Sequence, residues 1–208
     1  MAVKYDLAII GGGPGGYTAA LKAASLGLKT VVIEKEKLGG VCLNRGCIPT
    51  KALLFAAGMF AKMQDCDDFG VSTDFISFDF GKMQDYKRRS VNQYRQGIKA
   101  LFDENHIDLV EGTATIRRDK NIEVNGEEGK GFFEAENIII ATGAAPALPP
   151  IPGIERDGVM TSCQILSSSS WNYDRLTIIG GGVIGVEFAT IFNALCSKVT
   201  ILEKSGSL

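Results

Sequence analysis

Two cysteines, Cys42 and Cys47, are the residues of this sequence best suited to chemistry. They stand five positions apart in the segment Gly39–Lys51. Their sulfurs can meet if the intervening backbone bulges, and Gly46 lets the chain fold back. Pro49 fits the first turn of a following helix, because its missing N–H would be unpaired there anyway. The sequence therefore predicts a redox-active cysteine pair beside a cofactor.

Lys51 is placed to support that chemistry. Cys47 is predicted to lie near a helix N-terminus, with Lys51 one turn further on. The helix dipole and the positive charge of Lys51 both favour a thiolate over a thiol at Cys47. Lys51 could also stabilise negative charge on a reduced cofactor ring.

Other uses of the cysteine pair fit the sequence less well. A structural disulfide is disfavoured because nothing marks the chain as secreted, and cytosolic disulfides are usually catalytic. A metal site is not expected, because no second Cys or His pair at ligand spacing accompanies the first. A thioredoxin-type motif has two residues between its cysteines, whereas this segment has four. We interpret the scattered Cys66, Cys163 and Cys196 as ordinary core or surface thiols.

A nucleotide-binding pattern comes before the cysteines. Strands are predicted over Lys4–Ile10 and Lys29–Ile33, with a helix over Tyr17–Leu26 between them. The glycines at 11, 13 and 16 give a tight turn, room for a pyrophosphate and close helix–strand packing. The helix N-terminus then faces the diphosphate, and Glu34 is placed to accept hydrogen bonds from an adenosine ribose.

The middle of the chain is expected to form a helical region and then a small antiparallel β-meander. A helix continues over Ala52–Met63, a loop follows, and a long amphipathic helix is predicted over Asp79–Asn105. The short alternating runs predicted as strands are Ile107–Glu111, Thr113–Arg117, Ile122–Val124 and Phe132–Ala135. A buried strand, Asn137–Ala141, is expected to rejoin the first sheet before the proline-rich linker Ala144–Gly153.

The nucleotide-binding pattern recurs at a constant offset of 169 positions. The offset places Gly11, Gly13 and Gly16 on Gly180, Gly182 and Gly185, and it places Lys29, Glu34 and Lys35 on Lys198, Glu203 and Lys204. Six matches at one offset indicate a duplicated unit and two dinucleotide sites.

A carboxylate at Glu203 would repel the 2′-phosphate of NADP, so the second site is expected to bind NAD. The first site adjoins the cysteines, and FAD suits it because a flavin accepts two electrons from a dithiol.

The chain of 208 residues is 45% hydrophobic with a net charge of −2, so no nucleic-acid or membrane-surface partner is indicated. No targeting segment or membrane span is visible, and a cytoplasmic location is expected.

The predicted fold class is α/β, with two Rossmann-like dinucleotide-binding units, the second incomplete, and the meander in the first. The predicted domains are residues 1–147, which bind FAD and carry the cysteine pair, and residues 148–208, the first part of an NAD-binding domain.

Four segments together resemble the pyridine nucleotide–disulfide oxidoreductases: Gly11–Tyr17, Gly39–Lys51, Ile138–Gly143 and Gly180–Glu187. Leu43 and Ile48–Lys51 are more similar to the lipoamide-reoxidising branch than to the glutathione or mercuric reductase branches. The resemblance implies an FAD-dependent dihydrolipoamide:NAD oxidoreductase that serves a 2-oxoacid dehydrogenase or glycine-cleavage complex. Its expected partners are dihydrolipoamide on a lipoyl-carrying protein and, for the full-length enzyme, a second copy.

The resemblance also assigns roles to residues. Cys42 is implied to be the interchange thiol that meets dihydrolipoamide, and Cys47 the charge-transfer thiolate against the flavin. Lys51 is implied to approach the flavin N5 and to pair with Glu187. The other residues implied to bind FAD are Gly11, Gly13, Pro14, Gly15, Gly16, Glu34, Lys35, Gly40, Val41, Gly112, Ala114, Ala141, Thr142, Gly143 and Ala144. Those implied to bind NAD are Gly180, Gly182, Val183, Ile184, Gly185, Glu187 and Glu203.

Three departures from the family pattern qualify these expectations. Val41 stands where threonine is common, and Cys196 stands where a glycine usually ends the helix. The chain stops at Leu208, before the segment that supplies a His–Glu general base to a dimer partner. We therefore expect an N-terminal portion that is weakly active or inactive alone. The alternatives are another disulfide reductase of the family, of mercuric or glutathione type, and a non-catalytic FAD-binding chain.

Overall fold

The computed structural model describes residues 3–118, 121–127, 129–168 and 173–207. It divides into two compact units. The first unit comprises Met1–Arg45 and Val91–Ala147, and the second comprises Gly46–Ser90 and Leu148–Leu208. Within the described residues, no helix is both long and apolar enough to cross a membrane.

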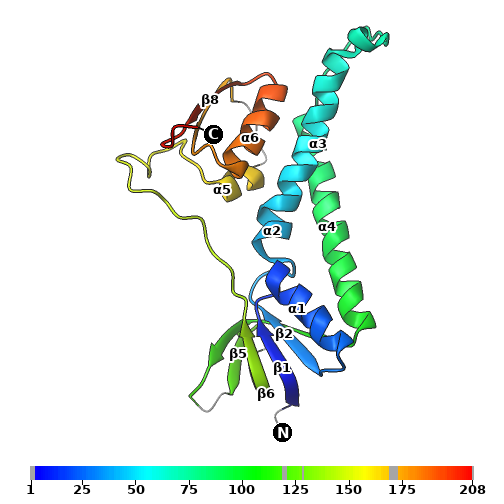
Figure 1. Cartoon of the computed structure of the whole chain (residues 1–208), viewed down its shortest axis with the longest axis vertical. Coiled ribbons are helices and arrows are strands. Elements are labelled where there is room, and N and C mark those ends of the chain that lie inside the picture. Colours follow the sequence, from blue (N-terminus) through cyan, green and yellow to red (C-terminus); the bar gives the residue numbers. More distant parts are fainter. Residues whose placement is uncertain (1–2, 119–120, 128, 169–172, 208) are drawn as a thin grey trace. The chain divides into compact units, whose positions relative to one another are not determined.

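The first unit is a mixed α/β structure built on a six-stranded sheet (Figure 1). Its strands lie in the order β3-β2-β1-β6-β5-β4, with β3, β2, β1 and β6 parallel and β6, β5 and β4 antiparallel. The strand bounds are β1 Val3–Ile10, β2 Thr30–Glu34, β3 Asp108–Glu111, β4 Thr113–Ile116, β5 Ile122–Gly126 and β6 Gly129–Ile140. Its helices are α1 Pro14–Ser25, α2 Gly40–Arg45 and the later part of α4 Phe80–Glu104.

The antiparallel part differs from the sequence-based expectation in two respects. The segment predicted as the first meander strand is β3, which pairs in parallel with β2. The two strands predicted over Phe132–Ala135 and Asn137–Ala141 are one continuous strand, β6. Phe133 pairs both with Ile122 of β5 and with Val3 of β1, so one strand serves two neighbours in succession.

The end of β6 was predicted to be buried, and this was wrong. Ile139 is 39% exposed and Ile140 is 67% exposed. An apolar run identifies a strand, but burial also requires another layer to cover it.

Both faces of β2 are covered, which explains why all five of its residues are buried. Val32 packs with Ile9, with Ala20 and Ala23 of α1, and with Phe102 of α4. On the opposite face, Val31 and Ile33 pack with Ala8 and with Ile122 and Val124 of β5. Side chains alternate along a strand, so each face of the sheet has its own core.

The second unit is mainly helical. Its elements are α3 Cys47–Gln64, the 3₁₀ turn η1 Cys66–Phe69, α4 up to Ser90, α5 Ser162–Ser167, α6 Val183–Ala194, and the parallel pair β7 Arg175–Ile179 and β8 Lys198–Leu202. Leu53 and Ala57 of α3 pack with Ile191 and Phe192 of α6, and these residues form the centre of its core. The helix predicted over Asp79–Asn105 is confirmed as α4.

The 169-residue offset holds at the level of individual hydrogen bonds. Helix α1 and helix α6 have bounds that differ by that offset at both ends. Gly11 N donates to Ile33 O at 2.8 Å, and Gly180 N donates to Leu202 O at the same distance. The sequence repeat is therefore also a repeat of strand–turn–helix–strand geometry.

The residue that follows the helix C-cap differs between the two halves of the repeat, and this difference carries a stability prediction. Gly27 ends α1 with φ +81°, and the matching Cys196 has φ +67°. A left-handed backbone conformation costs a residue with a side chain roughly 1–2 kcal/mol. Glycine avoids this cost, but it loses more conformational entropy on folding, so the net gain from a glycine is smaller. We expect Cys196→Gly to raise the free energy of unfolding by about 0.5–1 kcal/mol. Urea unfolding measures this, with Gly27→Ala as the matched control that should lose stability. A less stable Cys196→Gly would contradict the argument.

Candidate functional site

The cysteine pair lies where two helices meet end to end along the chain. Cys42 is in α2, Cys47 is the first residue of α3, and the single residue Gly46 separates the two helices. Both cysteines are in a disulfide, and they are bonded to each other. Cys42 is half-buried and Cys47 is exposed. The segment between them was expected to be a bulging loop. It is instead a short helix ended by Gly46, whose φ of −145° and ψ of −105° are not helical.

The first turn of α3 is fixed by contacts of its own. The Thr50 hydroxyl donates to Gly46 O at 2.7 Å, and Thr50 N donates to the same carbonyl at 3.0 Å. Thr50 and Pro49 are buried. These contacts hold the N-terminus of α3, with Cys47 at its first position, where the helix dipole favours a negative sulfur.

Lys51 lies one turn beyond Cys47 and forms an ion pair within the second unit. Its Nζ is 2.6 Å from Oε1 of Glu187 in α6, with the Lys51 side chain 57% exposed and that of Glu187 22% exposed. An exposed pair of this kind contributes little to stability, typically below about 1 kcal/mol. The pair therefore matters chiefly because Glu187 fixes the position of the Lys51 ammonium relative to the start of α3.

The glycine turn before α1 has the tight geometry that a phosphate-binding turn requires. Gly11 has φ +106°. A Cβ added to Gly16 would lie 1.8 Å from Gly11 O, a distance that no side chain can occupy. The N-cap of α1 is Gly13, which has no side chain to cap the helix. The first N–H groups of α1 are thus left to bind an anion.

The same turn lies against the segment that leads into α2. Gly39 N donates to Gly12 O at 2.8 Å, and a Cβ on Gly40 would come within 2.7 Å of Gly13 Cα. The helix that carries Cys42 therefore starts directly on the glycine turn. This close backbone packing connects the cysteine segment to the nucleotide-binding pattern.

Glu34 is the buried acid at the end of β2. One carboxylate oxygen accepts from Gly12 N at 2.7 Å and the other accepts from Glu36 N at 2.9 Å. A carboxylate has about four lone-pair positions, so these two bonds leave acceptor capacity for a ligand hydroxyl. Glu34 thus holds the glycine turn in place and can still accept a hydrogen bond from a ligand hydroxyl.

Glu203 occupies the same place in the repeat. Its carboxylate accepts from Ser205 N at 2.7 Å and from Gly181 N at 2.6 Å. The backbone hydrogen bonds from Ser205 and then Gly181 hold the pKa of the Glu203 carboxyl below its ordinary value. A group of this kind stays ionised down to a lower pH than usual and carries a full negative charge at neutral pH.

Several other predicted residues of the first unit follow the carboxyl ends of its parallel strands, whereas Ala114 lies within the antiparallel strand β4. Gly112 follows β3 and donates to Glu34 O at 2.9 Å, and Ala141 follows β6 and donates to Ile10 O at 2.8 Å. Thr142, Gly143 and Ala144 continue from Ala141. The carboxyl ends of parallel strands are where ligands bind in α/β sheets. In the second unit, Val183 and Ile184 open α6 and are exposed.

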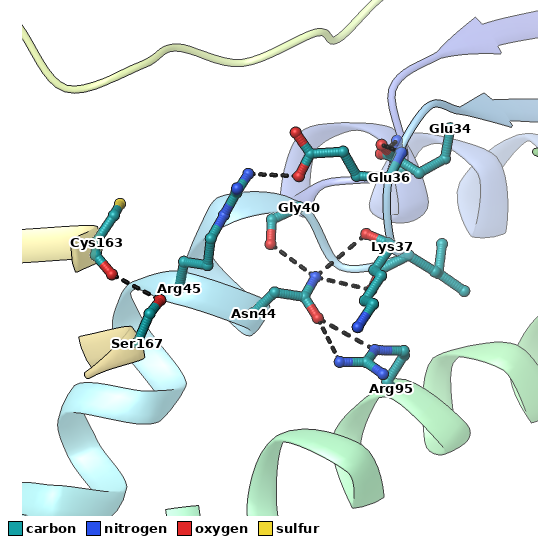
Figure 2. Close-up of polar contacts among 11 residues, drawn as sticks. Glu34, Glu36, Lys37, Gly40, Asn44, Arg45, Arg95, Cys163 and Ser167 are labelled. Atoms are coloured by element: carbon teal, nitrogen blue, oxygen red, sulfur yellow. Dashed lines mark hydrogen bonds and ion pairs between the residues drawn. The ribbon is translucent and has the colours of Figure 1, made fainter. Parts of the chain in front are cut away.

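Sequence reasoning missed a polar network around α2 (Figure 2). Asn44 donates to the backbone carbonyls that precede it and accepts from Arg95 of α4, while Arg45 pairs with Glu36 at 2.5 Å. Asn44 and Arg95 are 51 positions apart, so no local pattern could reveal their contact. The sequence held no signal for Asn44, because its segment was expected to be a loop, where asparagine is common.

Comparison with known proteins gives one family. The family model described as pyridine nucleotide-disulphide oxidoreductase matches residues 5–208. A dihydrolipoyl dehydrogenase of Acholeplasma laidlawii is 46% identical over 209 residues, which cover 98% of this chain and 60% of that protein. One from Bacillus subtilis (strain 168) is 43% identical over 204 residues, which cover 97% of this chain and 44% of that protein. The chain thus spans about half the length of the curated relatives it matches.

A solved structure is similar over nearly the whole chain. It is the Cu(II) complex of the HOCl-induced flavoprotein disulfide reductase RclA from Escherichia coli, with a TM-score of 0.81 and 35% sequence identity. The match covers 98% of this chain and 43% of that one.

Proposed function

The chain belongs to the pyridine nucleotide-disulphide oxidoreductase family, and on that premise we propose that it carries the dithiol-reactive disulfide of an FAD-dependent dihydrolipoamide:NAD oxidoreductase. The observation that carries the proposal is the Cys42–Cys47 disulfide, whose first cysteine lies in a helix that begins on the glycine turn. The dihydrolipoyl dehydrogenases that are 46% and 43% identical to this chain support the choice of substrate.

The first unit fits FAD on two observations. The turn is so closely packed that a Cβ at Gly16 or Gly40 would clash with Gly11 O or Gly13 Cα, and the N-terminus of α1 has no side-chain cap, so its first N–H groups can bind a phosphate. When bound, FAD supplies a two-electron acceptor for the cysteine pair and a hydride donor for NAD. The residues proposed to hold it are those implied by the resemblance: Gly11, Gly13, Pro14, Gly15, Gly16, Glu34, Lys35, Gly40, Val41, Cys42, Cys47, Lys51, Gly112, Ala114, Ala141, Thr142, Gly143 and Ala144.

NAD is proposed to bind at the second glycine turn. Gly180 has φ +105°, and a Cβ on Gly185 would lie 2.0 Å from Gly180 O, which repeats the geometry of the first turn. The ionised Glu203 disfavours a 2′-phosphate and therefore favours NAD over NADP. The residues proposed for this site are Gly180, Gly182, Val183, Ile184, Gly185, Glu187 and Glu203.

The cysteines carry the chemistry with the dithiol. A thiolate of dihydrolipoamide attacks the Cys42 sulfur, so that a mixed disulfide forms and Cys47 leaves as a thiolate. The second substrate thiol then displaces Cys42, and lipoamide leaves with its ring disulfide formed. Two electrons have moved from the substrate to the cysteine pair; of the two substrate protons, one is taken up by Cys42 and the other is released to solvent, so that Cys47 remains a thiolate. The start of α3 and the Lys51 ammonium stabilise the negative charge at Cys47.

The domain organisation is also proposed. Residues 1–147 are assigned to FAD binding and residues 148–208 to the first part of an NAD-binding domain. In support, the two compact units change over between Ala147 and Leu148, although residues 46–90 cluster with the second unit. Two Rossmann-like units are supported by the hydrogen bonds that recur at the 169-residue offset. A lipoyl-carrying protein and a second copy are the proposed partners, and the cytoplasm is the proposed location.

An anaerobic titration with dihydrolipoamide tests this function. The purified chain is supplied with FAD, and its visible spectrum and thiols are followed as the dithiol is added. We expect one equivalent of dihydrolipoamide to convert the disulfide to two thiols at Cys42 and Cys47 and to perturb the flavin spectrum. A bound flavin that responds neither to dithiol nor to NADH would instead support a non-catalytic FAD-binding chain.

A second candidate is a flavoprotein disulfide reductase with a different substrate. The similarity to the Escherichia coli disulfide reductase, at a TM-score of 0.81, favours it. A preference for NADPH, together with no thiol formation from dihydrolipoamide, would select this candidate over the first.

A further inference from the structure

Asn44 connects the helix of Cys42 to the segment that precedes it. Its Nδ2 donates to Gly40 O at 2.9 Å and to Lys37 O and Leu38 O, each at 3.2 Å (Figure 2). Two amide hydrogens are thus shared among three carbonyls. The segment that they brace is the one that lies on the glycine turn.

Arg95 of α4 fixes the orientation of that amide. Its Nη2 and Nε donate to Asn44 Oδ1 at 2.7 Å and 3.1 Å, and its Nη1 donates to Asn92 Oδ1 at 3.3 Å. A guanidinium has donors and no acceptor, so only the oxygen of Asn44 can face it. The Asn44 amide must then turn its Nδ2 toward the carbonyls. Both side chains are half-buried, so water competes less for this contact than for the exposed pair between Arg45 and Glu36.

Helix α2 depends on such contacts for its structure. It has six residues, well below the length at which a helix is stable alone in water. If α2 loosens, Cys42 gains freedom in the reduced protein that must be lost again when the disulfide forms. Contacts that keep α2 ordered therefore favour the disulfide over the dithiol.

We propose that Arg95 is a positioning residue that shifts the thiol–disulfide equilibrium of Cys42 and Cys47 toward the disulfide by holding Asn44, and through it α2, in place. The proposal rests on the proposed function, because it gives the role to a reversible cysteine pair. It does not depend on flavin or NAD chemistry.

The test measures this equilibrium in dithiothreitol redox buffers. Dithiothreitol opens the Cys42–Cys47 bond through a mixed disulfide and becomes a cyclic disulfide, so two electrons and two protons pass to the cysteines. Acid quenching, thiol alkylation and peptide mass spectrometry give the reduced fraction at Cys42 and Cys47. We expect Arg95→Met to need about tenfold less reduced dithiothreitol, relative to oxidised, for half-reduction, which corresponds to about 30 mV for a two-electron couple.

Two further variants separate positioning from a general loss of structure. Arg95→Lys keeps one positive donor without the planar fork, so a smaller shift in the same direction is expected. Lys99→Met removes an exposed cation one turn further along α4, where Lys99 pairs with Asp103, and should leave the equilibrium unchanged. Unchanged equilibria in Arg95→Met and Arg95→Lys, or an equal shift in Lys99→Met, overturn the proposal. If circular dichroism shows that Arg95→Met is unfolded, Arg95→Lys decides alone.

The outcome is distinguishable from failure of the proposed function. A wild-type disulfide that is reduced by dithiothreitol but not by dihydrolipoamide contradicts the proposed substrate, while the variants still report on Arg95.

Discussion

Serine at either Cys42 or Cys47 is expected to abolish reduction of the flavin by dihydrolipoamide, with a rate loss of more than about 10³-fold, or about 4 kcal/mol in the barrier. A single remaining thiol cannot form the intramolecular disulfide that accepts two electrons from the substrate. Stopped-flow reduction of the FAD-loaded chain measures the loss.

The two serine variants should differ in their spectra. In the proposed arrangement Cys47 lies against the flavin, so Cys42→Ser keeps a thiolate there and should show a long-wavelength charge-transfer band. Cys47→Ser should show none. Cys66→Ser is the control, since Cys66 lies outside the disulfide and should behave as the wild type. Retention of dithiol-driven reduction in both Cys42→Ser and Cys47→Ser would falsify the assignment of the redox centre.

Alanine at Gly16 is expected to destabilise the first unit by about 3 kcal/mol or more and to release the flavin. The added Cβ would lie 1.8 Å from Gly11 O, and the obstacle is backbone rather than a flexible side chain. Relief would require α1 to move away from β1, which would open the core around Ile9 and Ala20. Thermal unfolding and flavin content after gel filtration measure the two effects.

The neighbouring Gly15 provides a matched control for folding. A Cβ there meets nothing within 4 Å, so Gly15→Ala should keep or slightly raise stability because alanine favours the helix. The second turn offers the same comparison, since Gly185→Ala would clash at 2.0 Å with Gly180 O whereas Gly182→Ala would meet nothing. Equal melting temperatures for Gly16→Ala and Gly15→Ala would show that close packing at the turn is unimportant.

Several features followed from the sequence because each depends on residues close together in the chain. Glycine spacing gave the turn before α1, and apolar patterns gave β1, β2 and α4 with small errors at their ends. The two cysteines and Pro49 gave a redox pair at a helix start. The 169-residue offset gave the second strand–helix–strand element, and the resemblance to the family identified Cys196 as standing where a glycine usually ends the helix.

Tertiary structure decided what depends on residues far apart. It determined that β3 pairs with β2 rather than joining the meander, and that β6 continues without a break, because strand pairing is set by partners and not by local composition. It brought Arg95 within 2.7 Å of Asn44, a contact that nothing in the sequence indicated. The Lys51–Glu187 pair, at 2.6 Å, was expected from the family resemblance and is confirmed, but no local pattern predicts it. Residues that are 51 and 136 positions apart come into contact only when the chain has folded, so the local spacing of residue types cannot predict such contacts.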